Sequence, residues 1–282
     1  MPDHKIDLPG GNHSVLLIHG LTGSPFEMKY LARKLNKAGF TVKGPCLEGH
    51  CSTLKNLSKT DWKDWYRSVR ESFIEMKKSS DSVSIVGLCM GALLCLHLSY
   101  EFGSGVAAVS LISTTIFYDG WSLPWFKFLL PISYWVPFRY IYSYSETEPY
   151  GIKNEALRER IVNLMKNDSI AYTKTPAASM HELFKLIREV KKELPAITTP
   201  ALILHSREDD LTSTKNPDFV EKKIGSQIVR KIILDDSYHM MTIDNQKDRV
   251  AEETINFFRE QISPAVQRGH QTGEFPFHTD YL

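Results

Sequence analysis

The chain has 282 residues, of which 42% are hydrophobic and 24% charged, and its formal net charge is +1. This length fits one large α/β domain with an insertion better than two independent domains. The near-neutral charge gives no electrostatic basis for binding nucleic acid, and the polar first residues do not form a signal peptide, so we expect a cytoplasmic protein.

Strand and helix patterns alternate along the chain, which predicts a mainly parallel sheet covered by helices on both faces. The apolar run Val15–Ile18 is typical of a strand buried on both sides. Ser24, Pro25 and Glu27 mark the start of a helix, since they supply a capping hydroxyl, a proline at the first helical position and the acid of a capping box. The other predicted strands are Phe40–Val42, Val83–Val86, Val106–Ile112, Ala201–Leu204 and Val229–Leu234. The other predicted helices are Asp61–Lys77, Ala92–Phe102, Asn216–Gly225 and Gln246–Ile262.

Residues 114–195 break this alternation and are predicted to form a lid inserted between two strands of the sheet. Residues 1–113 and 196–262 then make up the core, and residues 263–282 form a tail to which we assign no function. The aromatic stretch Trp121–Phe138 is as long as a membrane span, but its three prolines and a lysine exclude a spanning helix. These apolar side chains either pack the lid onto the core, or they form an acyl-chain pocket or a site of transient contact with a membrane surface.

Four cysteines are present, at positions 46, 51, 89 and 95. Cys46 and Cys51 make a single C-x4-C pair, which without a second pair is weak evidence for zinc. We therefore expect no metal and reduced thiols.

The segment Gly87-Leu88-Cys89-Met90-Gly91 follows a predicted strand and precedes a predicted helix, as a nucleophile elbow requires. Its two glycines supply the small neighbours that such a tight turn needs. The N-terminus of the following helix favours a thiolate at Cys89. The alternative is a buried structural cysteine at a glycine-rich turn.

Three further segments lie at predicted strand ends. The turn His19-Gly20-Leu21-Thr22-Gly23 can direct a backbone N–H toward the nucleophile, so Leu21 and Met90 are predicted to form an oxyanion hole. Asp209 and Asp210 compete for the role of the acid that orients a histidine, and His239 is that histidine by its position. The order of nucleophile, acid and histidine is that of the α/β-hydrolases.

The chain resembles the bacterial carboxylesterase and monoacylglycerol-lipase-like branch of the α/β-hydrolase superfamily. The resemblance is carried by the segments LLIHGLTGSP, FTVKGPCLEGH, TDWKDWY, GLCMGA, PALILHSREDD and SYHMMTIDNQKD. It implies an α/β-hydrolase fold, to which we expect a helical lid to be added as an insertion, and we expect no cofactor. It also implies a triad in which Asp209, rather than Asp210, orients His239.

The sequence departs from this family at two positions. Cys51 stands where the family has the last glycine of a G-H-G triplet, and Cys89 stands where it has the serine nucleophile. Because a thiolate leaves a tetrahedral intermediate more easily than an alkoxide, attack on simple alkyl esters tends to revert. Thioesters, aryl esters and strained lactones carry better leaving groups. Polyhydroxyalkanoate synthases and dienelactone hydrolases also place a cysteine in this elbow, although their other segments match this chain poorly.

The sequence therefore predicts a hydrolase that cleaves a small ester or thioester of an apolar acyl group through Cys89, His239 and Asp209. One alternative is an acyltransferase or thioesterase that uses the same residues. Another is a non-catalytic fold that binds a ligand. The oligomeric state is not predicted.

Overall fold

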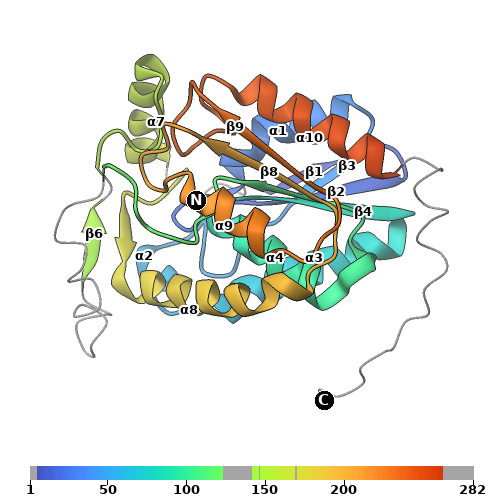
Figure 1. Cartoon of the computed structure of the whole chain (residues 1–282). Coiled ribbons are helices and arrows are strands. Elements are labelled where there is room, and N and C mark those ends of the chain that lie inside the picture. The colour runs from blue at the N-terminus through green and yellow to red at the C-terminus, as the bar shows by residue number, and fades with distance from the viewer. Residues whose placement is uncertain (1–4, 123–141, 146, 169, 263–282) are drawn as a thin grey trace.

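The computed structural model describes residues 5–122, 142–145, 147–168 and 170–262. A seven-stranded sheet runs through the centre of the protein in the order β1-β3-β2-β4-β5-β8-β9, and only the edge strand β1 is antiparallel to its neighbour (Figure 1). Its strands are β1 (Ile6–Leu8), β2 (His13–Ile18), β3 (Thr41–Gly44), β4 (Ser82–Leu88), β5 (Val109–Ile112), β8 (Ala201–Ser206) and β9 (Val229–Leu234).

Helices cover both faces of the sheet (Figure 1). On one face lie α1 (Lys29–Lys37) and α10 (Lys247–Ile262), and on the other lie α3 (Trp62–Ser79), α4 (Met90–Phe102), α8 (Ala177–Glu193) and α9 (Lys215–Lys223). Because helices cover the sheet on both faces, consecutive residues of a central strand are all buried, and such a strand is apolar along its whole length. In β2, Leu16 and Ile18 join one hydrophobic cluster, and Val15 and Leu17 join the cluster on the opposite face.

The predicted strands and long helices are present, with small shifts at their ends. The β5 strand begins three residues later than expected, because residues 103–105 form a turn of 3-10 helix that ends at Val106. Asp61 caps α3 and forms a capping box with Asp64. Ser24 caps a 3-10 turn, Pro25–Met28, that leads into α1. The strand β1 was not predicted, since three residues carry too little pattern.

The region predicted to be the lid contains α7 (Glu155–Asp168) and the two-stranded sheet of β6 (Ser143–Ser145) and β7 (Lys174–Pro176). Its last helix, α8, packs against α3 and α4, and its residues Leu183, Leu186 and Val190 belong to the same hydrophobic cluster as those helices. The division into core and lid stays a prediction. Most of the stretch Trp121–Phe138 and the tail 263–282 lie outside the described residues.

The remaining short elements are α2 (Leu54–Leu57) and the 3-10 turn Leu194–Ala196. Across the part of the chain that the structure describes, no helix combines the length and apolar character needed to span a membrane.

Candidate active site

The turn between β4 and α4 holds Cys89 in a backbone conformation that few side chains adopt, with φ 57° and ψ −115°. Close contacts explain the glycines beside it. A Cβ on Gly87 would lie 2.2 Å from the carbonyl oxygen of Gly91, and a Cβ on Gly91 would lie 2.2 Å from that of Ile18. This is the strand-turn-helix context that a nucleophile elbow requires, and the Cys89 side chain stays partly exposed at the carboxyl end of the sheet.

His239 and Asp209, which are both buried, meet at the carboxyl ends of β8 and β9. His239 Nδ1 lies 2.8 Å and 3.0 Å from the two carboxylate oxygens of Asp209. The carboxylate can only accept, so Nδ1 carries the proton and Nε2 is the ring atom that can accept one. Among the described residues Nε2 makes no well-aligned hydrogen bond, although Cys89 is close enough to affect the ring electrostatically.

Asp209 is held in place by its own loop. Its Oδ1 atom accepts hydrogen bonds from the backbone N–H groups of Leu211 (2.9 Å) and Thr212 (2.8 Å), and its Oδ2 atom accepts one from the Thr212 hydroxyl (3.0 Å). Burial alone would raise the pKa of the Asp209 carboxyl, but His239, followed by His205 and the backbone N–H of Thr212, brings that pKa below its usual value. The acid therefore remains a carboxylate.

The histidine shows the complementary shift. Burial acts to lower the pKa of His239, but Asp209 and Cys89 outweigh it and raise that pKa well above its usual range. A proton on this ring is thus stabilised from both sides.

The neighbouring acid, Asp210, has a different set of contacts. Its carboxylate accepts hydrogen bonds from the backbone N–H of His239 (3.3 Å) and from that of Gly151 (3.2 Å). It therefore fixes the main chain of the histidine loop and not the imidazole ring. Burial raises the pKa of Asp210. The sequence pattern alone did not distinguish the two adjacent acids, but their contacts do: Asp209 contacts the imidazole ring of His239, and Asp210 contacts its backbone.

The loop that carries Leu21 lies against Cys89, since a Cβ on Gly20 would lie 3.6 Å from the Cβ of Cys89. His19 accepts a hydrogen bond at Nε2 from the Leu47 N–H (3.3 Å), so its Nδ1–H donates to the Gly20 carbonyl (2.9 Å). In a trans peptide the N–H and C=O groups point in opposite directions, so the Leu21 N–H faces away from His19. Met90, the first residue of α4, follows Cys89 directly.

Two buried side chains to which the sequence analysis gave no role in the site also support this loop. Glu27 Oε2 accepts the Gly20 N–H at 3.1 Å, although we expected Glu27 to complete a capping box. His50 Nε2 donates to the Leu21 carbonyl at 2.7 Å. Burial lowers the pKa of His19 to about 3 and that of His50 to about 4, so both rings are neutral. In the sequence, the one indication of this supporting role was that His19 and Glu27 lie on either side of the glycine turn.

The base of the predicted lid is attached to the histidine loop. The Asp244 carboxylate accepts hydrogen bonds from the backbone N–H groups of Lys153 (2.8 Å), Asn154 (3.1 Å) and Tyr238 (2.8 Å). The Met240 N–H donates to the Gly151 carbonyl at 2.8 Å. Residues on both sides of His239 are therefore fixed to residues 151–154.

Cys46 and Cys51 form a disulfide, and the expectation of reduced thiols at these positions was wrong. Their Cα atoms lie 6.3 Å apart, within the range that a disulfide spans. A turn with positive φ at Gly49 (78°) brings them together, which the spacing of two cysteines could not show. His50 lies inside this loop, so the disulfide closes the segment that contacts Leu21.

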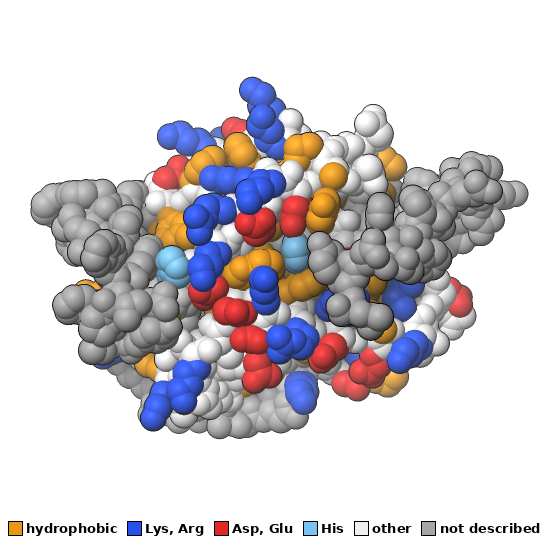
Figure 2. All heavy atoms as spheres, turned by 90° about the horizontal axis from the view of Figure 1, so that it is seen from below, with side chains coloured by type: hydrophobic (Ala, Val, Ile, Leu, Met, Phe, Trp, Pro, Cys, Tyr) orange, Lys and Arg blue, Asp and Glu red, His pale blue; other side chains and the backbone are white. Residues whose placement is uncertain are grey.

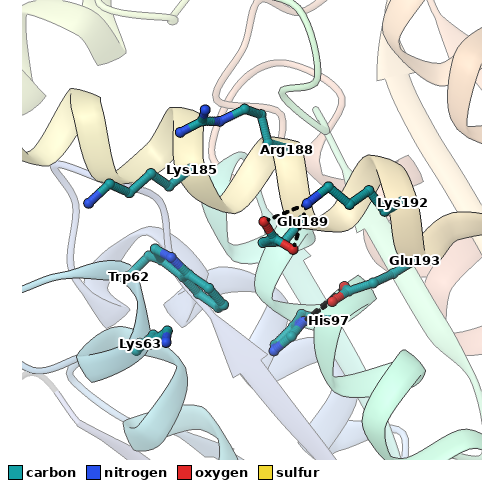
Figure 3. Close-up of a pocket in the computed structure, with 8 residues that line it drawn as sticks. All are labelled: Trp62, Lys63, His97, Lys185, Arg188, Glu189, Lys192 and Glu193. Atoms are coloured by element: carbon teal, nitrogen blue, oxygen red, sulfur yellow. Dashed lines mark hydrogen bonds and ion pairs between the residues drawn. The ribbon is translucent and has the colours of Figure 1, made fainter.

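A cavity of about 550 Å³ lies between α3, α4 and α8 (Figure 3). Trp62 and His97 line it together with charged side chains, and His97 is paired with Glu193 at 2.8 Å. Seen from below, the visible surface of the protein mixes Lys and Arg with Asp, Glu and apolar side chains (Figure 2). No residue of the Cys89, Asp209 and His239 cluster lines this cavity, so it is separate from the candidate active site.

Residues 11–246 match the Hydrolase_4 family, which is described as serine aminopeptidase, S33. A thermostable monoacylglycerol lipase from Bacillus sp. (strain H-257) is 31% identical over 88% of this chain and 91% of its own length. A carboxylesterase from Bacillus subtilis (strain 168) is 25% identical over 88% of this chain and 93% of its own.

Solved structures of lipolytic enzymes are also similar. A structure of the metagenome-derived lipolytic enzymes LipS and LipT superposes with a TM-score of 0.78 at 25% identity and covers 92% of this chain and 99% of its own. A monoacylglycerol lipase from Paleococcus ferrophilus superposes with a TM-score of 0.76 at 16% identity and covers 91% of this chain and 98% of its own.

Proposed function

Because the chain belongs to the Hydrolase_4 family and has the predicted α/β-hydrolase fold, we propose that it cleaves carboxylic esters or thioesters of an apolar acyl group, with Cys89 as nucleophile. The relatives named as monoacylglycerol lipase and carboxylesterase support an ester-hydrolysing activity. The observation that carries the proposal is the hydrogen bond between His239 and Asp209 beside a cysteine held in the elbow conformation.

In the first half-reaction, His239 Nε2 takes the proton of Cys89 and the thiolate attacks the substrate carbonyl carbon. The carbonyl oxygen becomes an oxyanion, which the N–H groups of Leu21 and Met90 stabilise. The C–O or C–S bond of the substrate then breaks. The leaving alcohol or thiol takes its proton from His239, and the acyl group remains on Cys89 as a thioester.

In the second half-reaction, water replaces the leaving group. His239 removes a proton from the water as it attacks the thioester carbonyl, and Asp209 stabilises the resulting imidazolium. The oxyanion again lies against Leu21 and Met90. The intermediate collapses with cleavage of the C–S bond, which releases the carboxylic acid, and the proton on His239 returns to the sulfur.

The cysteine favours substrates with good leaving groups. A thiolate is expelled from the tetrahedral intermediate more easily than an alkoxide, so an alkyl ester tends to return to starting materials. Thioesters and aryl esters compete better with the sulfur. Acyl transfer to an alcohol, amine or thiol is the second candidate function, because the acyl-enzyme is itself a thioester.

We propose that the region 114–195 covers the acyl-binding site, since ligands of α/β sheets bind at the carboxyl ends of the strands. Its attachment to the histidine loop through Asp244 and Asp210 supports this arrangement.

The test is a panel of p-nitrophenyl esters and acyl thioesters of several chain lengths, assayed with the wild type and with Cys89→Ala. Turnover that Cys89→Ala abolishes supports the proposal. Product analysis with added alcohol or amine separates hydrolysis from acyl transfer. If the wild type turns over none of these substrates and a thiol reagent fails to label Cys89 at neutral pH, a non-catalytic binding fold is the better account.

A further inference from the structure

The short segment that follows β5 contacts two members of the candidate triad. Ser113 has a positive φ of 49°, and its N–H still continues the sheet by donating to the Leu204 carbonyl at 2.9 Å. This turn directs two buried hydroxyl groups toward the site. The Ser113 hydroxyl donates to the carbonyl of His239 at 2.7 Å, and the Thr115 hydroxyl lies 3.3 Å from the Cys89 sulfur.

The Thr115 contact is a full hydrogen bond by distance, since sulfur is a large atom and bonds to it are longer than those to oxygen. Thr115 is completely buried, so water does not compete for its hydroxyl group. The same hydroxyl lies 3.4 Å from the Ser113 carbonyl, which is a long and weak contact for two oxygens.

These two contacts suit both protonation states of the cysteine. When Cys89 is a thiol, its S–H can donate to the Thr115 oxygen while the Thr115 O–H points to the Ser113 carbonyl. When Cys89 is a thiolate, the sulfur can only accept, so the Thr115 O–H turns toward it. Rotation of one hydroxyl hydrogen serves both states without movement of heavy atoms.

We propose that Thr115 is a further catalytic residue, whose hydroxyl group donates a hydrogen bond to the Cys89 sulfur whenever that sulfur carries negative charge. The proposal rests on the proposed function in taking Cys89 as the nucleophile. Hydrogen bonds to charged groups are stronger than those to neutral ones, so the contact favours the thiolate over the thiol.

The hydroxyl acts at two points of the reaction. Before attack, it increases the fraction of Cys89 that is ionised. During deacylation, the C–S bond breaks and its electron pair goes to sulfur. The Thr115 O–H then stabilises charge that was absent from the neutral thioester, which is an interaction gained in the transition state. No proton leaves Thr115 in either step.

Other charged and titratable groups also lie around the sulfur. His239 is one of them, with Asp209 on its ring and Asp210 on its backbone. Glu27 lies across Gly20 on the β2 side, where a Cβ on Gly20 would be 3.5 Å from its carboxylate. None of these groups contacts the hydroxyl of Thr115 through a hydrogen bond, so its removal leaves the charges around the site unchanged.

The test compares Thr115→Val, which has the same shape without the hydroxyl, with Thr115→Ser, which keeps the hydroxyl. Thr114→Val is the matched control, because Thr114 is the adjacent residue, and its buried hydroxyl has no hydrogen-bond partner in the described part of the chain. The rate of alkylation of Cys89 by iodoacetamide is measured from pH 5 to pH 9 by mass spectrometry of the peptide that contains it.

Thr115→Val is expected to move the midpoint of this rate profile upward by about one pH unit and to slow alkylation at the wild-type midpoint several-fold. Thr115→Ser and Thr114→Val are expected to follow the wild type. A Thr115→Val profile that superimposes on that of the wild type overturns the proposal, as does an equal shift in Thr114→Val. If Thr115→Val does not melt as a folded protein, Thr115→Ala takes its place with the same expected shift.

Alkylation requires no ester substrate, so this result is independent of the proposed function. A wild type that is alkylated readily but hydrolyses nothing contradicts the proposed function and leaves the Thr115 result to stand by itself. With an active wild type, Thr115→Val is also expected to accumulate acyl-enzyme, seen as an initial burst of p-nitrophenol followed by a slower steady state.

Discussion

Replacing Asp209 with asparagine changes the site by one group and leaves its shape intact. The Asp209 Oδ1 atom already accepts two backbone N–H groups, from Leu211 and Thr212, so the amide oxygen of the asparagine must occupy that position. Its NH2 group then replaces Oδ2, which lies 2.8 Å from His239 Nδ1. Two N–H donors cannot face each other at that distance, so the His239 proton moves to Nε2.

A histidine protonated at Nε2 cannot accept the proton of Cys89 or of water. The same exchange of aspartate for asparagine lowers turnover of a serine protease by about four orders of magnitude. A thiol ionises more readily than a hydroxyl and depends less on the base, so we expect a loss of about three orders of magnitude here, or roughly 4 kcal/mol in the activation barrier.

The assay is kcat/KM on a p-nitrophenyl ester, with thermal melting to verify folding. Asp210→Asn is the matched control, because in the described part of the chain its carboxylate accepts the backbone N–H groups of His239 and Gly151, and an amide oxygen can still accept one of them. It should lose less than about tenfold, the size of one ordinary hydrogen bond. Near-full activity in Asp209→Asn, or a greater loss in Asp210→Asn, would refute the reasoning.

Cys89→Ser should shift the preference from thioesters and aryl esters toward alkyl esters, and an unchanged ranking of substrates in a chain-length panel would contradict the leaving-group argument. Burial lowers the pKa of His13 and His50 to about 4 and that of His19 to about 3, whereas all three rings take up a proton near pH 6.5 once the chain is unfolded. Stability that is present above pH 6.5 should therefore be lost as the pH falls toward 4, by roughly 4 kcal/mol per pH unit. A melting temperature that stays constant over this range would contradict this expectation. Gly91→Ala places its Cβ 2.2 Å from the backbone carbonyl oxygen of Ile18 and should lower the free energy of unfolding by several kcal/mol, measured by urea unfolding. A decrease in that free energy below about 1 kcal/mol would show that the turn can relax.

The fold was predictable because its strands are buried on both faces. Val15–Ile18 lies in β2 and the run Val83–Val86 lies in β4, and both form continuous apolar runs that helices cover from each side. Element ends were less predictable, since they depend on local hydrogen bonds. Val106 reads as part of a strand by its side chain, but its N–H donates to the Gly103 carbonyl and ends a turn.

The candidate site was predictable where the backbone itself dictates residue type. Gly87 and Gly91 are required by contacts that any Cβ would violate, so the elbow is visible in the sequence. The supporting side chains were not predictable, because their partners are distant along the chain. Ser113 reaches His239, 126 residues away, and the role of His50 depends on a loop that a disulfide closes.

The measurement that tests the central claim most directly is the identification of the acyl-enzyme. The wild type is mixed with a p-nitrophenyl ester, quenched in acid within the first turnover and digested for mass spectrometry. We predict that the acyl group is attached to Cys89 as a thioester that hydroxylamine removes, and that Cys89→Ala neither carries the acyl group nor hydrolyses the ester. Hydrolysis that persists in Cys89→Ala, or an acyl group attached to any other residue, would contradict the assignment of Cys89 as the nucleophile.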